Sequence, residues 1–260
     1  LLGLLPGIGD TLGAALSSPD LQFSGFLIGQ EDGYSYLCKM LQGYQGNWLF
    51  HLRYTPEPHE GELFFLFYLL LGKLARLSGL SLIVAFHVSR AMLIPVGLCA
   101  FYQLACYLSP VAQVRRLAVL LFAFGAGLGW LWAALGLPTT LGDMPIDLWT
   151  PDASYFLSSL TYPHLALGQA LLFGFILFTL RYLDGGGKLN ALWAILLGLG
   201  ASLIHPYKLP VIGVPLAIYG LWGVWKSRWS LGRAALRLAV VFAPSGAYVV
   251  YAWRAFATNP

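Results

Sequence analysis

Residues 82–108 read LIVAFHVSRAMLIPVGLCAFYQLACYL, and this stretch decides the fold class. It is continuous, almost wholly apolar and carries one Lys or Arg, Arg90, and no Asp or Glu. An α-helix needs about 20 apolar residues to cross the hydrocarbon core of a bilayer. A run of this length therefore predicts a membrane-spanning helix rather than a strand or a helix of a soluble core.

The composition of the whole chain agrees with this prediction. The 260 residues are 58% hydrophobic and only 10% charged, with nine Trp and fourteen Tyr. Soluble domains carry about 25% charged residues, and Trp and Tyr concentrate at membrane interfaces. The net charge of +4 gives no sign of a nucleic-acid partner. Three cysteines form neither a disulfide framework nor a metal-binding spacing: Cys38, Cys99 and Cys106.

Several other segments have comparable length and hydropathy, so we predict an all-α, polytopic bundle of about six to seven membrane helices in a lipid bilayer. The expected spans, besides the first, are 116–136, 162–183, 189–206, 209–225 and 235–256. Segment 62–78 is shorter and holds Lys73 and Arg76, so we expect it to lie in the outer interface. The alternative is a helix that spans the membrane. Residues 1–5 look like the tail of a first helix, which would make 1–260 a single transmembrane domain from a longer chain.

Basic residues favour one orientation of these helices. They occupy alternate connections between the expected spans, at Arg115, Arg116, Arg181, Lys188, Lys226, Arg228, Arg233 and Arg237. Because cytoplasmic loops are enriched in Lys and Arg, we expect these connections to face the cytoplasm. The region before residue 80, with a long external loop over 17–80, and a second loop over 137–161 then face outward. These outward regions hold ten of the eleven acidic residues, Asp184 being the exception.

The first external loop carries an acidic pair before two tyrosines, in the order Glu31-Asp32-Gly33-Tyr34-Ser35-Tyr36. A carboxylate at such a loop-to-helix junction can serve as a general base toward a hydroxyl group. The structural alternative is that Asp32 caps the helix expected over 34–41. Both roles are compatible with the same side chain.

The second external loop carries Asp143, Asp147 and Asp152. Carboxylates are suitable ligands for Mg²⁺ or Mn²⁺, so a divalent cation held in part by Asp32 and Asp147 is one hypothesis. The alternative is that acids simply populate a water-facing loop, with Asp152 capping the helix that follows.

Cationic and imidazole side chains stand at the expected outer ends of the helices. His164, His205 and Lys208 can bind a phosphate or can anchor the helices at the headgroup level. Arg90 lies inside the apolar run on the same face as His87. A charge in that position indicates that the side chain faces an internal cavity or a polar partner. The structural alternative is that Arg90 pairs with an acid of the first loop.

The arrangement of these features resembles the GT-C superfamily of membrane glycosyltransferases, which includes protein O-mannosyltransferases, lipid A aminoarabinose transferases and oligosaccharyltransferase catalytic subunits. The resemblance rests on the first-loop pair Glu31-Asp32, the interfacial segment, the helix with Phe86-His87-Val88-Ser89-Arg90, the basic connection and the acidic second loop with Tyr162-Pro163-His164. It covers nearly the whole chain, and it lies in the order and positions of these features along the sequence.

The resemblance implies transfer of a sugar from a polyprenyl-phosphate donor to an acceptor outside the cell, in a bacterial plasma membrane. It assigns Asp32, with Glu31 beside it, as the catalytic acid, and the second-loop acids with His164 as secondary groups. Lys208, His205 and Arg90 would bind the lipid phosphate. The second-loop acids are four and five residues apart, which departs from the Asp-x-Asp spacing of metal-binding members.

Two other function classes compete with this hypothesis. A transporter would line a permeation path with Arg90, His87 and Lys208, but the chain shows no internal repeat of the kind that transporters have. A non-catalytic membrane subunit would use the same helices as a scaffold. Phosphate-binding loops, dinucleotide fingerprints, nucleophile elbows and zinc-protease helices are absent from the sequence.

Overall fold

The computed structural model describes residues 25, 26, 28–137 and 145–258. Within these residues the secondary structure is helical, apart from one antiparallel bridge between Phe50 and Glu62. The prediction of an all-α fold is therefore confirmed for the part of the chain that the structure describes. The expected helix tail over 1–5 and most of the start of the first external loop lie outside it.

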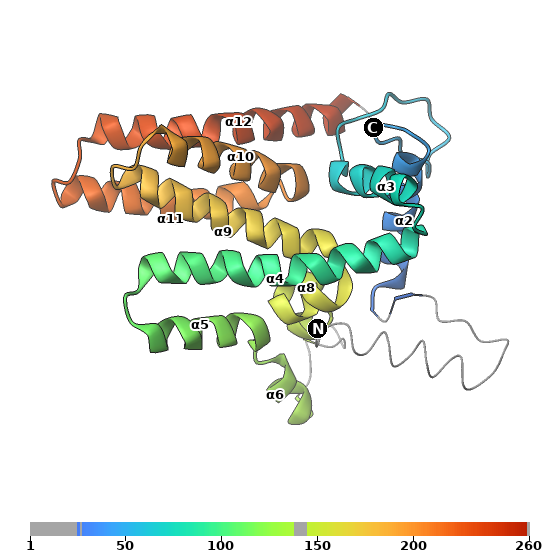
Figure 1. Cartoon of the computed structure of the whole chain (residues 1–260), viewed down its shortest axis with the longest axis horizontal. Coiled ribbons are helices and arrows are strands. Elements are labelled where there is room, and N and C mark those ends of the chain that lie inside the picture. The colour runs from blue at the N-terminus through green and yellow to red at the C-terminus, as the bar shows by residue number, and fades with distance from the viewer. Residues whose placement is uncertain (1–24, 27, 138–144, 259–260) are drawn as a thin grey trace.

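Four helices are long and apolar enough to cross a membrane, and they form the long axis of the molecule (Figure 1): α4 Leu82–Leu108, α9 Pro163–Leu183, α11 Lys208–Trp225 and α12 Leu231–Thr258. A further apolar helix, α10 Lys188–Ile204, is shorter. The described residues thus give four candidate spans where the sequence predicted six to seven. The difference arises from α10, which is short, and from the segment expected to span over 116–136.

The single helix expected over 116–136 is two helices in the structure, so that prediction was wrong. The first, α5, covers Ala112–Phe124, and the second, α6, covers Gly129–Ala134. The chain turns extended at Gly125, the first of three glycines in FGAGLG. Each glycine lowers helix stability by about 1 kcal/mol relative to alanine. A prediction from hydropathy does not include this effect.

Helix α9 is the centre of the bundle. In its apolar window 61% of the residues are buried, against 22–28% in the other three candidate spans. Helices α4 and α10 pack along it, and α12 reaches it as well. Its buried Phe175 and Leu177 belong to the same apolar cluster as Ala194 of α10 and Val241 of α12. The first turn of α9, with Pro163 and His164, is buried as well.

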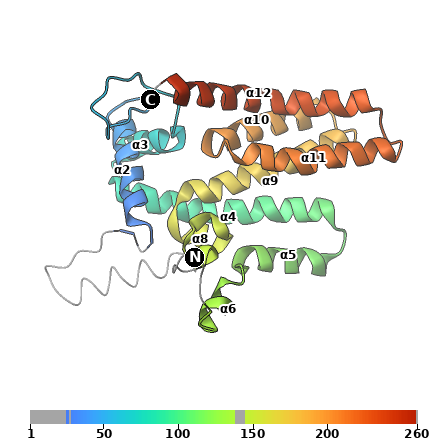
Figure 2. The ribbon, with the colours of Figure 1, turned by 180° about the vertical axis from the view of Figure 1, so that it is seen from behind.

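Two shorter helices, α2 Gln30–Tyr44 and α3 Leu66–Ser78, lie together at one end of the bundle, and α2 runs across that end (Figures 1 and 2). Their backbones touch because glycines face each other: a Cβ at Gly72 would overlap the Met40 carbonyl oxygen, and one at Gly43 would overlap that of Leu69. Helix α3 occupies the segment expected to lie in the interface. The closely packed pair of α2 and α3 lies against this end of the bundle.

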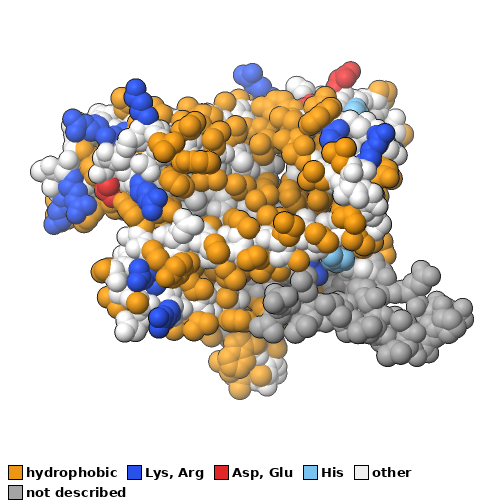
Figure 3. Space-filling model, viewed as in Figure 1, with side chains coloured by type: hydrophobic (Ala, Val, Ile, Leu, Met, Phe, Trp, Pro, Cys, Tyr) orange, Lys and Arg blue, Asp and Glu red, His pale blue; other side chains and the backbone are white. Residues whose placement is uncertain are grey.

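The remaining short elements, α7 Ile146–Trp149, the 3₁₀ turn Pro151–Ala153 and α8 Tyr155–Thr161, lead into α9. The α4–α5, α9–α10 and α11–α12 connections share the end of the bundle opposite to α2 and α3 (Figures 1 and 2). In Figure 3 many Lys and Arg side chains gather at that basic end, and an apolar band separates the two ends. The basic connections that the sequence singled out are therefore neighbours in space.

Candidate functional site

A cavity of about 290 Å³ lies at the end of the bundle where α2 and α3 meet the starts of α9 and α11. Four residues that the sequence predicted as site residues line it together: Asp32, Asp152, His164 and His205. They come from α2, the 3₁₀ turn, α9 and the α10–α11 connection. Tyrosines that the sequence analysis did not assign complete much of the polar wall: Tyr36, Tyr68, Tyr162 and Tyr207.

Gly29 explains how Asp32 reaches the cavity. This glycine adopts the left-handed conformation at φ 65° and is the N-cap of α2. A Cβ at Gly29 would overlap the hydroxyl of Tyr162, which donates a hydrogen bond to the Gly29 carbonyl at 2.8 Å. The start of α2 is thereby fixed to the start of α9. Asp32 lies in the first turn of α2, so the expectation that it caps a helix over 34–41 was wrong.

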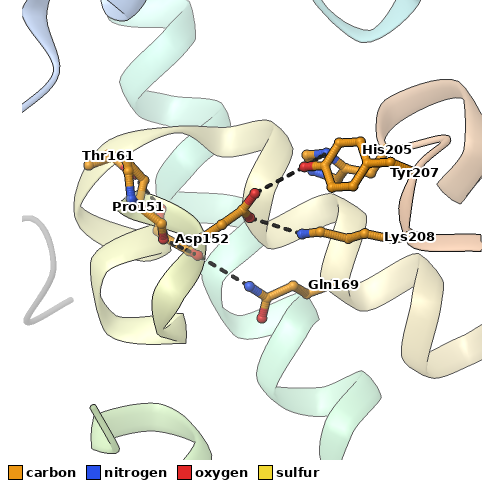
Figure 4. Close-up of polar contacts among 8 residues, drawn as sticks. Pro151, Asp152, Thr161, Gln169, His205, Tyr207 and Lys208 are labelled. Carbon is orange, nitrogen blue, oxygen red and sulfur yellow. Dashed lines mark hydrogen bonds and ion pairs between the residues drawn. The ribbon is translucent and has the colours of Figure 1, made fainter. Parts of the chain in front are cut away.

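Asp152 is held by two partners from the α10–α11 connection and the start of α11 (Figure 4). Lys208 Nζ lies 2.9 Å from Oδ1, and the Tyr207 hydroxyl donates to Oδ2 at 3.0 Å. Burial acts to raise the pKa of this carboxyl, but Lys208, His205 and Tyr207 outweigh it and hold the pKa below its usual value. The capping role considered for Asp152 belongs instead to Ser154, whose Oγ accepts from the Leu157 amide.

His205 follows the last turn of α10 and is buried, with 4% of its surface exposed. Its Nδ1 lies 3.0 Å from the Tyr207 hydroxyl. Burial, together with the positive charge of Lys208, lowers the pKa of His205 to about 4. The imidazole is consequently neutral at neutral pH, which weakens the cationic phosphate-binding role that the sequence suggested.

His164 lies in the first turn of α9, after Pro163, and is also buried. Its Nδ1 is 2.6 Å from the hydroxyl of Tyr68, a fully buried side chain of α3. Tyr36 stacks on Tyr68 with ring centroids 4.5 Å apart and lies 4.8 Å from the His164 ring. Burial, with a smaller contribution from Asp32, raises the pKa of Tyr36. The hydroxyl groups in this wall therefore stay protonated.

A buried lysine in α2 stands behind this wall and was not predicted. Lys39 donates to Ser35 Oγ at 2.9 Å, and its ammonium lies 4.6 Å from the Tyr36 ring centroid and 4.1 Å from that of Phe65. Burial lowers its pKa. The tyrosines and this lysine gave no distinct sequence signal, because aromatic and basic residues are expected at any membrane interface.

Other predicted site residues lie elsewhere. Glu31 is exposed and does not line the cavity. Asp147 accepts from the Gly129 amide at 2.8 Å and so closes the start of α6. Arg90 is buried and donates to the Leu160 carbonyl, and it has no acidic partner among the described residues. Asp143 lies outside the described residues.

The predicted divalent cation finds no ligand set in the described part of the chain. Asp32 lines the cavity and Asp147 does not, and no group of three or more His, Cys, Asp or Glu among the described residues is suited to hold a metal ion. Asp152 is already engaged by Lys208 and Tyr207. We therefore derive no chemical step through a metal.

Polar groups from four separate segments thus meet at one end of an apolar bundle. The carboxylates of Asp32 and Asp152, the second of them paired with Lys208, and two imidazoles surround a space of small-molecule size. Comparisons with protein-family models, with curated proteins and with solved structures give no match.

Proposed function

We propose that this protein is a membrane glycosyltransferase that moves a sugar from a polyprenyl-phosphate donor to a hydroxyl group of an acceptor. The observation that carries the proposal is the shared cavity of Asp32 and Asp152. These carboxylates come from α2 and from the 3₁₀ turn before α8, which are distant in the sequence, and they meet beside His164 and His205. Binding sites of this kind are concave, mostly apolar and furnished with a few convergent polar groups.

The position of the cavity supports an active site on the outer face of a plasma membrane. The basic connections lie at the opposite end of the bundle (Figure 3), and the positive-inside rule assigns such connections to the cytoplasm. A cavity at one end also favours an enzyme over a transporter, because transporters bind their substrates near the middle of the bilayer.

Asp32 is the carboxylate best suited to act as the general base. Asp152 is neutralised by Lys208, whereas Asp32 has no ion-pair partner among the described residues. In the proposed reaction the acceptor oxygen attacks the anomeric carbon of the donor while Asp32 takes the hydroxyl proton. The bond between that carbon and the phosphate oxygen breaks, and polyprenyl phosphate leaves with the electron pair.

The other groups suit the donor. Lys208 uses one N–H on Asp152, and an ammonium has two more to offer to a phosphate. Rings of Tyr36, Tyr162 and Tyr207 line the cavity and provide apolar faces against which the C–H face of a sugar can pack. Asp152 keeps Lys208 in place, so we assign it a positioning role.

The test compares two neighbouring carboxylates of the same helical turn. Asp32→Asn should lower sugar transfer by about 10²–10⁴-fold, the usual effect of losing a general base. Glu31→Gln removes the same charge one residue away, from an exposed side chain outside the cavity, and should leave transfer unchanged. The assay uses the full-length protein in membranes with a panel of radiolabelled polyprenyl-phosphate hexoses and pentoses.

Loss of the charge at position 32 also removes a favourable interaction with the start of α2, about 0.3–1 kcal/mol. Thermal unfolding of both variants therefore has to be measured alongside transfer. Transfer that persists in a folded Asp32→Asn protein would overturn the assignment of the base, and absence of transfer by the wild-type protein from every donor would overturn the proposed function.

A further inference from the structure

Tyr36 lies one helical turn after Asp32 on α2, and both side chains line the cavity. Residues four apart share one face of a helix. The Tyr36 ring is held from several sides, because the ring centroid of Tyr68 lies 4.5 Å away in a stacked geometry and that of Tyr162 lies 5.0 Å away, edge-on. The Lys39 ammonium is 4.6 Å from the same ring centroid. These contacts restrict the direction in which the Tyr36 hydroxyl points.

Five residues of the cavity wall carry a hydroxyl group, and four of these groups are already bonded or enclosed. The Tyr162 hydroxyl donates its one proton to a backbone carbonyl, and that of Tyr207 donates to a carboxylate. The Tyr68 hydroxyl is fully buried against an imidazole. Thr150 Oγ1 is buried and so closed off from the cavity. The hydroxyl of Tyr36, a partly buried residue, is neither enclosed nor hydrogen-bonded to any described residue, so its proton is available to a ligand.

The charges near Tyr36 indicate the state of this hydroxyl group. Burial raises the pKa of Tyr36, and the carboxylates of Asp32 and Asp152 raise it further. The hydroxyl is therefore protonated at neutral pH and lies close enough to both carboxylates for their charges to act on it. Asp152 is in turn paired with Lys208. A ligand anion that contacts Lys208 beside Asp152 would thus lie in the neighbourhood of the Tyr36 hydroxyl.

The proposed reaction creates a need for such a donor. The phosphate of a polyprenyl-phosphate sugar carries one negative charge while it is esterified on both sides. When its bond to the anomeric carbon breaks, the electron pair stays on the phosphate oxygen and the charge rises toward two. Lys208 supplies one positive charge and already shares it with Asp152. A further hydrogen-bond donor at the leaving oxygen therefore stabilises the transition state more than the bound donor substrate.

We infer that Tyr36 is a catalytic residue whose hydroxyl donates a hydrogen bond to the phosphate oxygen from which the sugar departs. Tyr36 keeps its proton throughout, the acceptor proton goes to Asp32, and polyprenyl phosphate leaves as a dianion. The two carboxylates of the wall cannot take this role, because an ionised carboxylate only accepts. His205 Nε2 cannot take it either, because it is enclosed. The inference rests on the function proposed above.

The first test detects the hydrogen bond without any transfer reaction. A 3-fluorotyrosine is incorporated at position 36 of the full-length protein in nanodiscs, and its ¹⁹F signal is followed during titration with farnesyl phosphate. The signal should shift, because the fluorine lies next to the hydroxyl group. Farnesol, which lacks the phosphate, and methyl mannoside, which offers sugar oxygens alone, should leave it unchanged. The same label at position 34, on α2 but outside the cavity lining, is the control and should respond to none of these compounds.

The second test removes the hydroxyl group and keeps the ring. Tyr36→Phe should weaken the binding of farnesyl phosphate by about 10–100-fold, the effect of one hydrogen bond to a charged group. In the transfer assay it should lower kcat by about 10²–10³-fold, as the loss of one transition-state donor does, with a smaller change in KM for the lipid donor. Tyr34→Phe makes the same change on the same helix and should alter neither quantity. Thermal unfolding of Tyr36→Phe should match that of the wild-type protein, because the hydroxyl has no hydrogen-bond partner among the described residues.

Several results would overturn the inference. A ¹⁹F signal at position 36 that ignores farnesyl phosphate, or that follows farnesol or methyl mannoside equally, would remove the phosphate contact. Unchanged affinity and kcat in a folded Tyr36→Phe protein would remove the catalytic role.

The inference and the proposed function fail separately, because the binding experiments need no transfer. If farnesyl phosphate shifts the signal at position 36 but the wild-type protein transfers sugar from no donor, Tyr36 remains a phosphate ligand and the glycosyltransferase function is lost. If Tyr36→Phe transfers sugar at the full rate, the function stands and the role of Tyr36 is lost.

Discussion

The two ends of the bundle both carry charged and aromatic side chains, but they use them differently. At the basic end, Arg237 of α12 donates to the carbonyl oxygens of Tyr182 and Leu183 at 2.8 Å each, which closes the last turn of α9. Asp184, the next residue, accepts from the Tyr219 hydroxyl at 2.9 Å. These groups satisfy one another at a helix end, and the cluster ties α9, α11 and α12 together.

At the cavity end the polar groups leave hydrogen-bonding capacity unused. His205 Nε2 is buried without a hydrogen-bond partner among the described residues, and Asp32, an exposed residue, lines the cavity without an ion pair among those residues. Buried polar groups in folded proteins nearly always have partners. The basic end also holds a buried donor without a partner among the described residues, Arg115 Nε, so the two ends differ in arrangement: similar residue types close helix ends at one, whereas at the other four of them line one cavity.

The largest expected effect is an all-or-none difference in cysteine labelling between the two ends. It tests whether they face opposite sides of the membrane. In a protein freed of its three native cysteines, Ser227→Cys marks the basic end and Glu60→Cys marks the cavity end. A membrane-impermeant maleimide added to intact cells should label position 60 and leave position 227 unlabelled until the cells are opened. Labelling of both positions from outside would contradict the proposed topology.

The next effect is a pH dependence confined to the cavity end. The pKa of His205 is about 4 in the folded protein and near 6.5 in an unfolded chain. Between these values the unfolded state binds more protons, so stability falls as the pH is lowered from 6.5 to 4. The loss is on the order of 3 kcal/mol for this group. Asp152, with its pKa held below 3.8, titrates below that window.

Chemical denaturation of the reconstituted protein at several pH values measures this loss. His205→Asn should remove the contribution of one proton and make the profile less steep between pH 4 and 6.5. Arg237→Gln, at the basic end, should lower stability by a similar amount at every pH and keep the slope. An unchanged slope in His205→Asn would show that the acid sensitivity originates elsewhere.

Substituting one glycine by alanine at each end compares a closely packed position with one that has free space around it. A Cβ at Gly72 would overlap the Met40 carbonyl oxygen, whereas one at Gly232, near the start of α12, would meet nothing within 4 Å. Gly72→Ala is expected to cost about 1–3 kcal/mol, as overpacking does. Gly232→Ala should be neutral or slightly stabilising, because alanine favours the helix. Thermal unfolding in detergent compares the two, and equal midpoints would refute the close α2–α3 contact.

The smallest effect is expected at the partly exposed ion pair of the cavity end. The Lys208 and Asp152 side chains are 21% and 32% exposed, and pairs with such access to water contribute about 1 kcal/mol or less. A double-mutant cycle with Lys208→Met and Asp152→Asn should give a coupling energy of that size. Lys208→Met should weaken binding of polyprenyl phosphate more than it lowers stability. Unchanged binding would reduce Lys208 to a structural partner of Asp152.

Much of this organisation could be predicted from the sequence, because hydropathy and charge placement act over long segments. The helices of the bundle and the grouping of the basic connections follow from them, and Asp32, Asp152, His164 and His205 could be named as candidates. The break at Gly125 could not be found by hydropathy, since the residues around it stay apolar while helix propensity falls. The predicted cap roles failed because one residue decides a cap, and Gly29 and Ser154 took those positions.

The partners within the site could not be predicted either. Tyr68 meets His164, and Tyr207 stands between His205 and Asp152. Among fourteen tyrosines in an apolar chain, no spacing distinguishes a site residue from an interfacial anchor. Only the crossing of α2 and α3 over the start of α9 selects them.

The loop that precedes α3 is hydrogen-bonded to α12, a helix far from it in the sequence. The Tyr251 hydroxyl accepts from the Leu63 amide at 2.8 Å, and the Tyr248 hydroxyl donates to the Leu63 carbonyl at 2.9 Å. Leu63 leaves the ribosome well before α12 is made, so these bonds form only after α12 has been synthesised. During synthesis, therefore, the loop that contains the bridge between Phe50 and Glu62 stays without these two bonds until α12 packs against it.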